Sequence, residues 1–339
     1  MAPEIMKGAK PIDVCITVDT EFSIGGNFCD PDMAPIAKPI VLGAINGKEH
    51  GLGFILDSLA GFEIHATFFV EALQTAYFGD EPMGDIARRI ADAGHDVQLH
   101  LHPCWLHYEA DGKQSWDGEP NDSCAGRTDA ELDRFFDLGL AAFSRWGLPR
   151  PVGVRSGNFQ VDENFYRAAT RWGLGLSSSL VLRADRAADK GLVAMGVRHN
   201  IGKVLEFPVF SYTYHLGRRK RRRPLAITAC SHREVLSVLR QAYDYRVSPI
   251  VINTHPQEYV KRKDITYAIL RRNRVNQARF MAVLRFLSEN RDKFVALPIS
   301  ALRRADLVAS PDRPPISVPV GEVIARMFEN VINDRVWWY

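Results

Sequence analysis

The segment Ile12–Glu21 reads IDVCITVDTE and has the pattern of a β-strand that ends in acidic residues. Residues two apart on a strand point to the same side, so Asp19 and Glu21 project together from its carboxyl end. Two neighbouring carboxylates repel each other unless a cation or a shared proton relieves the repulsion. The segment therefore predicts a functional site at the end of this strand. A helix cap plus a solvated acid is the alternative.

Short β-branched runs continue to alternate with helical patterns, which predicts parallel strands joined by helices. We expect further strands at 65–70, 96–102, 152–155, 249–253 and 294–297, and helices at 53–59, 83–93 and about 275–290 and from 128, 162 and 231. Two of these helices begin at capping boxes, Thr128 with Glu131 and Ser231 with Glu234. We predict one α/β barrel over residues 1–300 and a C-terminal extension over 301–339, near a proline-rich stretch at 311–319.

Composition and charge are those of an ordinary globular protein. The 339 residues are 46% apolar and 24% charged, and 43 basic against 40 acidic residues give a net charge of +3. Six of the bases form the run 218–223, so the rest of the chain carries 37 bases and 40 acids, or −3. A nucleic-acid partner is therefore not expected. We interpret the run as a solvated loop. Contact with anionic lipid headgroups or a pyrophosphate-linked substrate is the alternative.

Several features predict a cytoplasmic protein. Asp13 and Asp19 interrupt the N-terminal apolar run that a secretory signal would need, and no stretch approaches the length of a membrane span. The five cysteines are scattered without a CxxC pair, which favours reduced thiols. The apolar cluster Val336–Tyr339 could dock on the barrel, enter a homo-oligomer interface or lie at a membrane surface, and we favour the first two.

Two further strands end in side chains suited to chemistry. His100 and His102 point the same way on their strand, and such a pair near carboxylates is an ordinary ligand set for zinc or a similar divalent ion. Two hydrogen-bonded core histidines are the alternative. His255 follows the strand at 249–253 and suits acid–base work, because its pKa lies near neutral pH. Arg155 ends another strand and is a natural partner for a carboxylate at the barrel mouth.

The chain contains, in order, Thr17–Glu21, Ala66–Phe69, Gly94–His100, Arg155 and His255–Pro256. Together these motifs resemble the NodB-homology polysaccharide deacetylases, the family-4 carbohydrate esterases and their relatives. The resemblance covers about residues 10–300. It implies a distorted (β/α)7-8 barrel of the NodB-homology type with a short C-terminal extension. It also implies a divalent metal ion, usually zinc, bound by one carboxylate and two histidines.

The motifs depart from the family pattern at two ligand positions. The first motif normally has two consecutive aspartates, but Thr20 occupies the second place. Relatives with one residue between the acids shift the ligand onward, so the resemblance assigns Glu21 to the metal and Asp19 to the base. The usual second histidine, four residues after the first, is replaced by Cys104. We expect His102 to take its place, as in the branch that reads His-x-His-Pro, with Cys104 as the alternative ligand.

The resemblance implies a metal-dependent hydrolase that removes an N-acyl group, most plausibly N-acetyl, from an amino sugar in a glycan or sugar conjugate. His255 would protonate the leaving amine, and Arg155 would orient Asp19. The prolines common after Arg155 are replaced by Ser156 and Gly157, and a backbone N–H near Asn158 is the family's usual oxyanion donor. Trp105, Tyr108 and Trp116 could stack on sugar rings or pack their own loop.

Two other functions remain open. One is hydrolysis of a non-sugar or formyl amide on the same scaffold, and the other is a catalytically inactive barrel that binds carbohydrate. The metal could be zinc, cobalt, nickel or iron.

Overall fold

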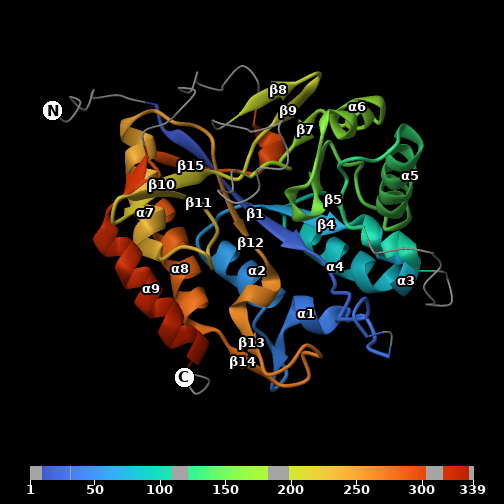
Figure 1. The fold of residues 1–339 in the computed structure, drawn as a ribbon, viewed down its shortest axis with the longest axis horizontal. Coiled ribbons are helices and arrows are strands. Elements are labelled where there is room, and N and C mark those ends of the chain that lie inside the picture. The colour runs from blue at the N-terminus through green and yellow to red at the C-terminus, as the bar shows by residue number, and fades with distance from the viewer. Residues whose placement is uncertain (1–9, 31, 109–120, 182–197, 303–315, 336–339) are drawn as a thin grey trace.

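The computed structural model describes residues 10–30, 32–108, 121–181, 198–302 and 316–335 (Figure 1). Its largest sheet runs in the order β12 (Ile250–Thr254), β1 (Ile12–Thr20), β4 (Thr67–Glu71), β5 (Asp96–Leu101), β6 (Gly153–Ser156), β7 (Leu176–Ser177), β9 (Val204–Glu206) and β8 (His199–Ile201). β15 (Phe294–Ala296) pairs with the first residues of β1. All neighbours are parallel except β8 and β9, which are antiparallel.

The sheet curls into a distorted, incompletely paired barrel, as the sequence predicts. Regular pairing stops between β9 and β12. The chain that follows β9 bridges this gap through a backbone hydrogen bond from Phe210 N to Val251 O, 3.0 Å, and another from Asn253 N to Leu225 O, also 3.0 Å. Irregular backbone therefore completes the ring of strands.

Helices cover the outside of this sheet (Figure 1). The main ones are α2 (Leu52–Gly61), α4 (Glu81–Asp92), α5 (Asp129–Arg145), α6 (Glu163–Arg171), α7 (His232–Asp244) and α8 (Arg274–Glu289), with the short α1 (Lys38–Leu42) and α3 (Thr75–Phe78). The predicted capping boxes at the starts of α5 and α7 are both present. Because the strands are buried on both faces, their apolar runs supply the core between sheet and helices.

The basic run is not the loop that the sequence suggested. Arg219–Pro224 forms β11, which pairs antiparallel with β10 (Ser211–Leu216), and β10 pairs in turn with β16 (Ser317–Val318). A strand is tolerated here because Arg218–Arg222 are exposed and solvated, while the Arg223 guanidinium lies 5.8 Å from the centre of the Tyr214 ring.

The C-terminal part of the chain contains a helix that the sequence analysis did not predict, α9 (Val320–Arg335). Its inner side packs on α7 and β10 through Val323 and Arg326. The terminal Val336–Tyr339 cluster lies outside the described residues. No helix in the described ranges is both long enough and apolar enough to cross a membrane. All five cysteines are free thiols.

A buried ion pair joins α9 to the barrel. Arg326 Nε lies 3.0 Å from the carboxylate of Glu234, and the two side chains are 5% and 0% exposed. We expect Arg326→Leu to lower the free energy of unfolding by about 3 kcal/mol, because Glu234 would be left buried without its counter-charge. Urea unfolding measures the change. Arg335→Leu, an exposed arginine of the same helix, is the control, and equal stability of the two variants would contradict the expectation.

Candidate metal centre and active site

The carboxyl ends of the parallel strands bring the predicted residues together. Asp19 lies near the end of β1, His100 in β5 and Arg155 in β6, while Glu21 and His255 follow directly after β1 and β12. The strand pairs β1–β12 and β5–β6 place these residues at one edge of the sheet, where His100 is in register with Arg155. In barrel enzymes the active site lies at this end of the strands.

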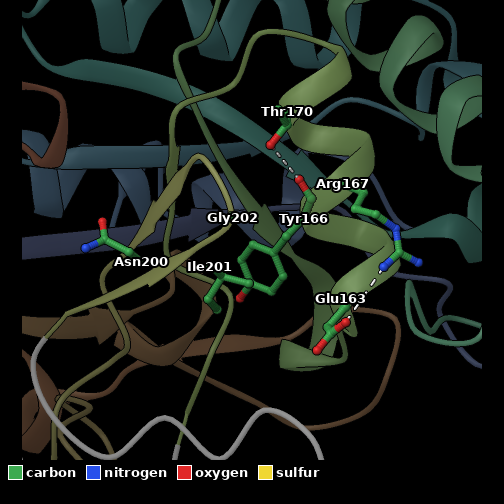
Figure 2. A pocket seen from close by; sticks show the side chains of 7 residues that line it. All are labelled: Glu163, Tyr166, Arg167, Thr170, Asn200, Ile201 and Gly202. Atoms are coloured by element: carbon green, nitrogen blue, oxygen red, sulfur yellow. Dashed lines mark hydrogen bonds and ion pairs between the residues drawn. The ribbon is translucent and has the colours of Figure 1, made fainter.

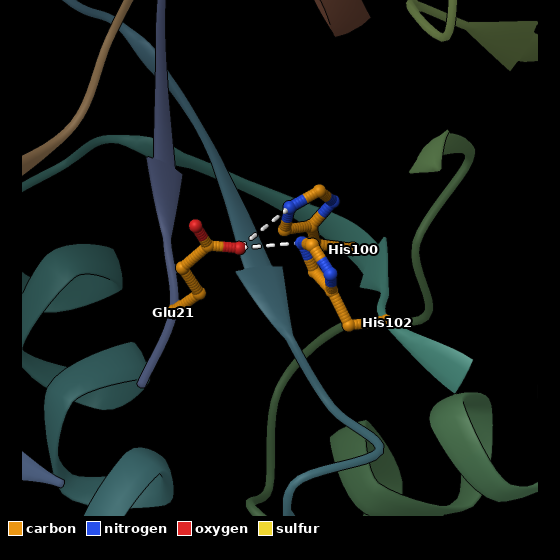
Figure 3. A group of neighbouring side chains, drawn as sticks. All are labelled: Glu21, His100 and His102. Carbon is orange, nitrogen blue, oxygen red and sulfur yellow. Dashed lines mark ion pairs between the residues drawn. The ribbon is translucent and has the colours of Figure 1, made fainter. Parts of the chain in front are cut away.

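Glu21, His100 and His102 form a compact cluster (Figure 3). Glu21 Oε2 lies 2.6 Å from His102 Nε2 and 3.3 Å from His100 Nε2. The three candidate ligand atoms all lie within 4.8 Å of one another. Burial raises the pKa of Glu21, but the two imidazoles outweigh burial and hold that pKa well below its ordinary value. Glu21 is therefore a carboxylate at neutral pH.

The remaining ring nitrogens fix the orientation of both histidines. His100 Nδ1 lies 2.9 Å from the carbonyl oxygen of Arg155, and His102 Nδ1 lies 2.7 Å from Asp122 Oδ2. A carbonyl only accepts hydrogen bonds, so Nδ1 of His100 carries a proton and Nε2 is the ring nitrogen that faces Glu21. Metal-binding histidines show the same outer hydrogen bonds to carbonyls and carboxylates. The donor set therefore fits a divalent metal ion.

Gly157 makes room for the His102 ring. A Cβ at this position would lie 2.4 Å from His102 Nδ1 and 2.5 Å from its Cε1, far inside contact distance. Any larger residue would force the ring away from Glu21. The Ser156–Gly157 pair, which departs from the usual prolines, is thus sterically matched to a histidine at position 102.

Cys104 belongs to a second, overlapping group with His102 and Asp122. Its backbone N–H donates to Asp122 Oδ1 over 3.3 Å. Burial raises the pKa of the Cys104 thiol, whereas a metal ligand must be a thiolate. This makes Cys104 the poorer candidate beside Glu21 and His100. Asp122 was not predicted as a site residue from the sequence.

Asp19 is held by a buried network. Its Oδ1 accepts from Arg155 over 2.5 Å and its Oδ2 accepts from Asn253 Nδ2 over 3.1 Å. Burial raises the pKa of Asp19, but Arg155, His100 and His255 together outweigh burial and lower it. Asp19 is therefore ionised at neutral pH. Asn253 was not predicted as a site residue, although it lies two residues before His255.

His255 lies on the other side of Asp19. Its Nε2 is 3.5 Å from Asp19 Oδ2, and its Nδ1 is 3.0 Å from Glu258 Oε1. Burial lowers the pKa of His255, but Glu258 and Asp19 outweigh burial and raise it to about 9. The site thus pairs a carboxylate that stays ionised with a histidine that stays protonated at neutral pH.

Glu71 ends β4 and was also missed by the sequence analysis. It is fully buried and accepts hydrogen bonds from the backbone N–H groups of Leu73, Gln74 and His102 over 2.9, 2.8 and 3.1 Å. Burial raises its pKa to about 8, against the opposing effects of His102 and these hydrogen bonds. Glu71 therefore fixes the backbone on which His102 stands.

Of the two alternatives for the aromatic residues, sugar stacking or packing of their own loop, the structure favours packing for Trp105 and Tyr108. Trp105 is only 1% exposed and packs against Tyr77, Phe78 and Tyr108, so its ring faces are covered by the protein's own side chains. Tyr108 is 5% exposed, and Trp116 lies outside the described residues. Asn158 donates from its side chain to Asp122 over 2.7 Å and so helps to position the partner of His102.

A separate hollow of about 450 Å³ lies between α6 and the turn that joins β8 and β9 (Figure 2). It is lined by Glu163, Tyr166, Arg167, Thr170, Asn200, Ile201 and Gly202. It contains no predicted site residue, and the hydroxyl of Tyr166 is already committed to Glu206 over 3.0 Å. The predicted chemistry does not take place there.

Comparison with solved structures identifies the fold. The chain is similar to a candidate polysaccharide deacetylase from Mycobacterium smegmatis, with a TM-score of 0.52 and 15% identity over 92% of this chain and 96% of that one. It also matches a family-4 carbohydrate esterase from Streptomyces lividans (TM-score 0.38, 12% identity, 83% and 90% covered). A third match is a family-4 pseudoenzyme from Bacillus anthracis (TM-score 0.44, 10% identity, 86% and 65% covered).

No protein-family model matches the sequence, and a search of curated proteins found no match. The first of the three structures confirms the distorted barrel of the NodB-homology type that the motifs predicted.

The raised pKa of Glu71 predicts a pH-dependent stability. The folded protein binds its proton up to about pH 8, whereas the unfolded chain loses it near 4.5. Between these pH values the folded state binds one proton more than the unfolded chain. The contribution of Glu71 to the free energy of unfolding is therefore fully present below pH 4.5. It decreases by about 1.4 kcal/mol per pH unit as the pH rises from 4.5 to about 8. Urea unfolding of metal-free Glu71→Gln should lack this component of the slope. Parallel pH profiles for the variant and the wild type would contradict the expectation.

Proposed function

We propose that the protein is a metal-dependent hydrolase that removes an N-acyl group from an amino sugar. The observation that carries the proposal is the cluster of Glu21, His100 and His102 directly beside the pair of Asp19 and His255. One carboxylate and two oriented histidines leave coordination positions open, which is the arrangement of catalytic metal sites. The fold shared with the candidate deacetylase adds support for this type of reaction.

Glu21, His100 and His102 would hold the ion, with Cys104 left as a protonated thiol. Zinc is the metal that best suits this mixed set of nitrogen and oxygen donors. A divalent ion bound there lowers the pKa of water and polarises the acyl oxygen. Ionised Asp19 would accept the proton of the attacking water, and its ion pair with Arg155 would hold its carboxylate in place.

His255 is suited to the second proton transfer. An amide nitrogen cannot leave as an anion, so it needs a proton as the C–N bond breaks. The raised pKa of His255 keeps the imidazole charged until that moment. The backbone N–H near Asn158 is the proposed donor to the developing oxyanion. The products are a free amine and a carboxylic acid.

N-acetyl on an amino sugar, within a glycan or a sugar conjugate in the cytoplasm, is the substrate that the motif resemblance favours. A formyl amide or a non-sugar amide would use the same groups in the same roles. A panel of N-acetyl and N-formyl substrates, with and without the sugar, distinguishes these possibilities by the ratio of their kcat/KM values.

Metal analysis tests the proposed ligands. We expect about one equivalent of zinc or another transition metal in the purified protein, lost in a His100→Ala/His102→Ala double variant because only Glu21 would remain. Cys104→Ala should keep its metal, and His65→Ala, an exposed histidine away from the cluster, is the matched control. Loss in Cys104→Ala would move the site to the second group. No metal after reconstitution would support an inactive sugar-binding barrel instead.

The roles of the base and the acid are tested by kinetics. Asp19→Asn should keep the metal and lose about 100- to 10,000-fold in kcat, because it removes a proton acceptor. In the wild type, kcat/KM should fall above about pH 9 as His255 loses its proton. A His255→Gln variant should be slow and lack this alkaline limb. An unchanged limb in the variant would assign the acid to another group.

A further inference from the structure

The outer face of α9 is an exposed apolar stripe. Six large apolar side chains on this helix are between 44% and 67% exposed, and they recur at positions i, i+4, i+7, i+8, i+11 and i+12: Val320, Ile324, Met327, Phe328, Val331 and Ile332. This spacing places them along one side of a helix about 24 Å long. A single exposed apolar residue is ordinary, but a continuous stripe marks a surface that something covers.

The stripe is not explained by packing within the described chain. The buried positions of α9 are Val323, Arg326 and Asn333, which belong to the opposite side of the helix. The Arg326 side chain binds Glu234, so this inner side is the one that faces the barrel, and the backbone carbonyl of Asn333 accepts a hydrogen bond from Lys261 Nζ. Figure 1 shows α9 along the outer edge of the molecule, away from α5.

The basic hairpin β10–β11 lies directly beside this helix. Tyr214 of β10 is in register with Val318, two residues before α9 begins. Arg223 and Arg326, one from the hairpin and one from the helix, lie 5.8 and 5.9 Å from the centre of the same Tyr214 ring. Arg326 lies on the inner side of α9, so this contact packs the hairpin against that side, and the pairing with Val318 places the hairpin next to the end of the helix where Val320 begins the stripe.

The charge of the hairpin is uncompensated. The side chains of Arg218–Arg222 are exposed, and among the described residues none of them lies within ion-pair distance of an acidic group. Leu216, at the turn of the hairpin, is 45% exposed and adds an apolar side chain between the bases. Successive side chains of β11 point to opposite faces, so Arg219 and Arg221 share one face of the hairpin and Lys220 and Arg222 the other. These exposed bases, none paired with an acid among the described residues, and the apolar stripe give this end of the molecule both basic and hydrophobic groups.

We propose that the outer face of α9 and the adjoining β11 bind the surface of an anionic lipid bilayer. An amphipathic helix lies in the interface with its apolar side among the acyl chains, and neighbouring bases are attracted to acidic headgroups. Stable attachment requires two such signals together, and this surface supplies both. A second copy of the chain could bury the apolar stripe but would leave the bases without counter-charges. An anionic bilayer would bury the stripe and also supply negative charges to the bases.

Sedimentation with lipid vesicles tests this surface in the full-length protein. We expect the wild type to sediment with phosphatidylcholine vesicles that contain about 30 mol% phosphatidylglycerol and to remain in solution with phosphatidylcholine alone. Binding should weaken at about 0.5 M NaCl, where screening shortens the reach of the bases. The vesicles contain no sugar, so the result does not depend on the proposed hydrolase activity.

A matched pair of variants assigns the binding to this face. Phe328→Glu/Arg221→Glu should lower partitioning at least about tenfold, because it places a charge in the stripe and reverses one in the strand. Leu138→Glu/Arg134→Glu makes the same changes at exposed positions of α5 and should bind as the wild type does. Circular dichroism and urea unfolding establish that both variants are folded.

Three results would overturn the proposal. The first is no sedimentation of the wild type with anionic vesicles, and the second is equal binding to neutral ones. The third is a wild-type dimer in analytical ultracentrifugation that Phe328→Glu converts to a monomer while vesicle binding is absent. That outcome would assign the stripe to a second copy of this chain.

Discussion

The contact between Arg155 and Asp19 is the interaction on which the site depends. Arg155 is fully buried, and burying a guanidinium is costly unless its donors are satisfied. Its Nε donates to the carbonyl of Ser178 over 2.7 Å, and NH2 donates to the Ser178 hydroxyl over 2.6 Å. Its Nη1 lies within hydrogen-bond distance of Asp19 Oδ1, the Thr17 hydroxyl and Asn253 Oδ1. The cation thereby links β1, β6 and β12 at their carboxyl ends.

The backbone of the same residue also orients His100, one of the three candidate metal ligands. The carbonyl of Arg155 accepts from His100 Nδ1, so the strand that fixes the proposed base also fixes one proposed ligand. A shift of β6 would therefore move Asp19 and His100 together. One strand, β6, therefore contacts both the proposed base and one proposed metal ligand.

Two differences from the motifs of the resembling family are physically related in this chain. These are the histidine at position 102 and the glycine at position 157. A histidine at position 102 stands closer along the chain to His100 than the usual second histidine, and its ring lies against residue 157. Only glycine leaves space there, since a Cβ would lie 2.4 Å from the ring nitrogen. Asp122 and Asn158 then complete the support of His102 from the loop side. In this chain, glycine at position 157 and histidine at position 102 therefore fit each other sterically.

Much of this arrangement could be predicted from the sequence. Asp19, Glu21, His100, Arg155 and His255 follow from strand periodicity, because the ends of parallel strands meet at one edge. Asp122 could not be placed, since it reaches His102 from a loop with no periodic pattern. Glu71 and Asn253 were not recognised as site residues, because each belongs to a strand made up mostly of apolar residues.

The errors outside the site have equally specific causes. The strand β11 could not be predicted from residues 218–223, because this charged run has no alternation of apolar and polar residues. Pairing with β10 stabilises the strand. The apolar residues of 320–335 have helical spacing. The helix α9 could therefore have been predicted in the same way as α5 and α8. The sequence left Trp105 open between sugar stacking and packing of its own loop, and its burial favours packing.

The electrostatics of the site separate the acid from the base. Arg155 favours the negative form of Asp19, and Glu258 favours the positive form of His255. Each group is stabilised by a partner on its far side, so their 3.5 Å contact does not have to supply the charge separation alone. Opposite shifts of two neighbouring groups are how a protein keeps a base and an acid ready at the same pH. The buried partners therefore hold the proposed base and the proposed acid in opposite charge states before a substrate binds.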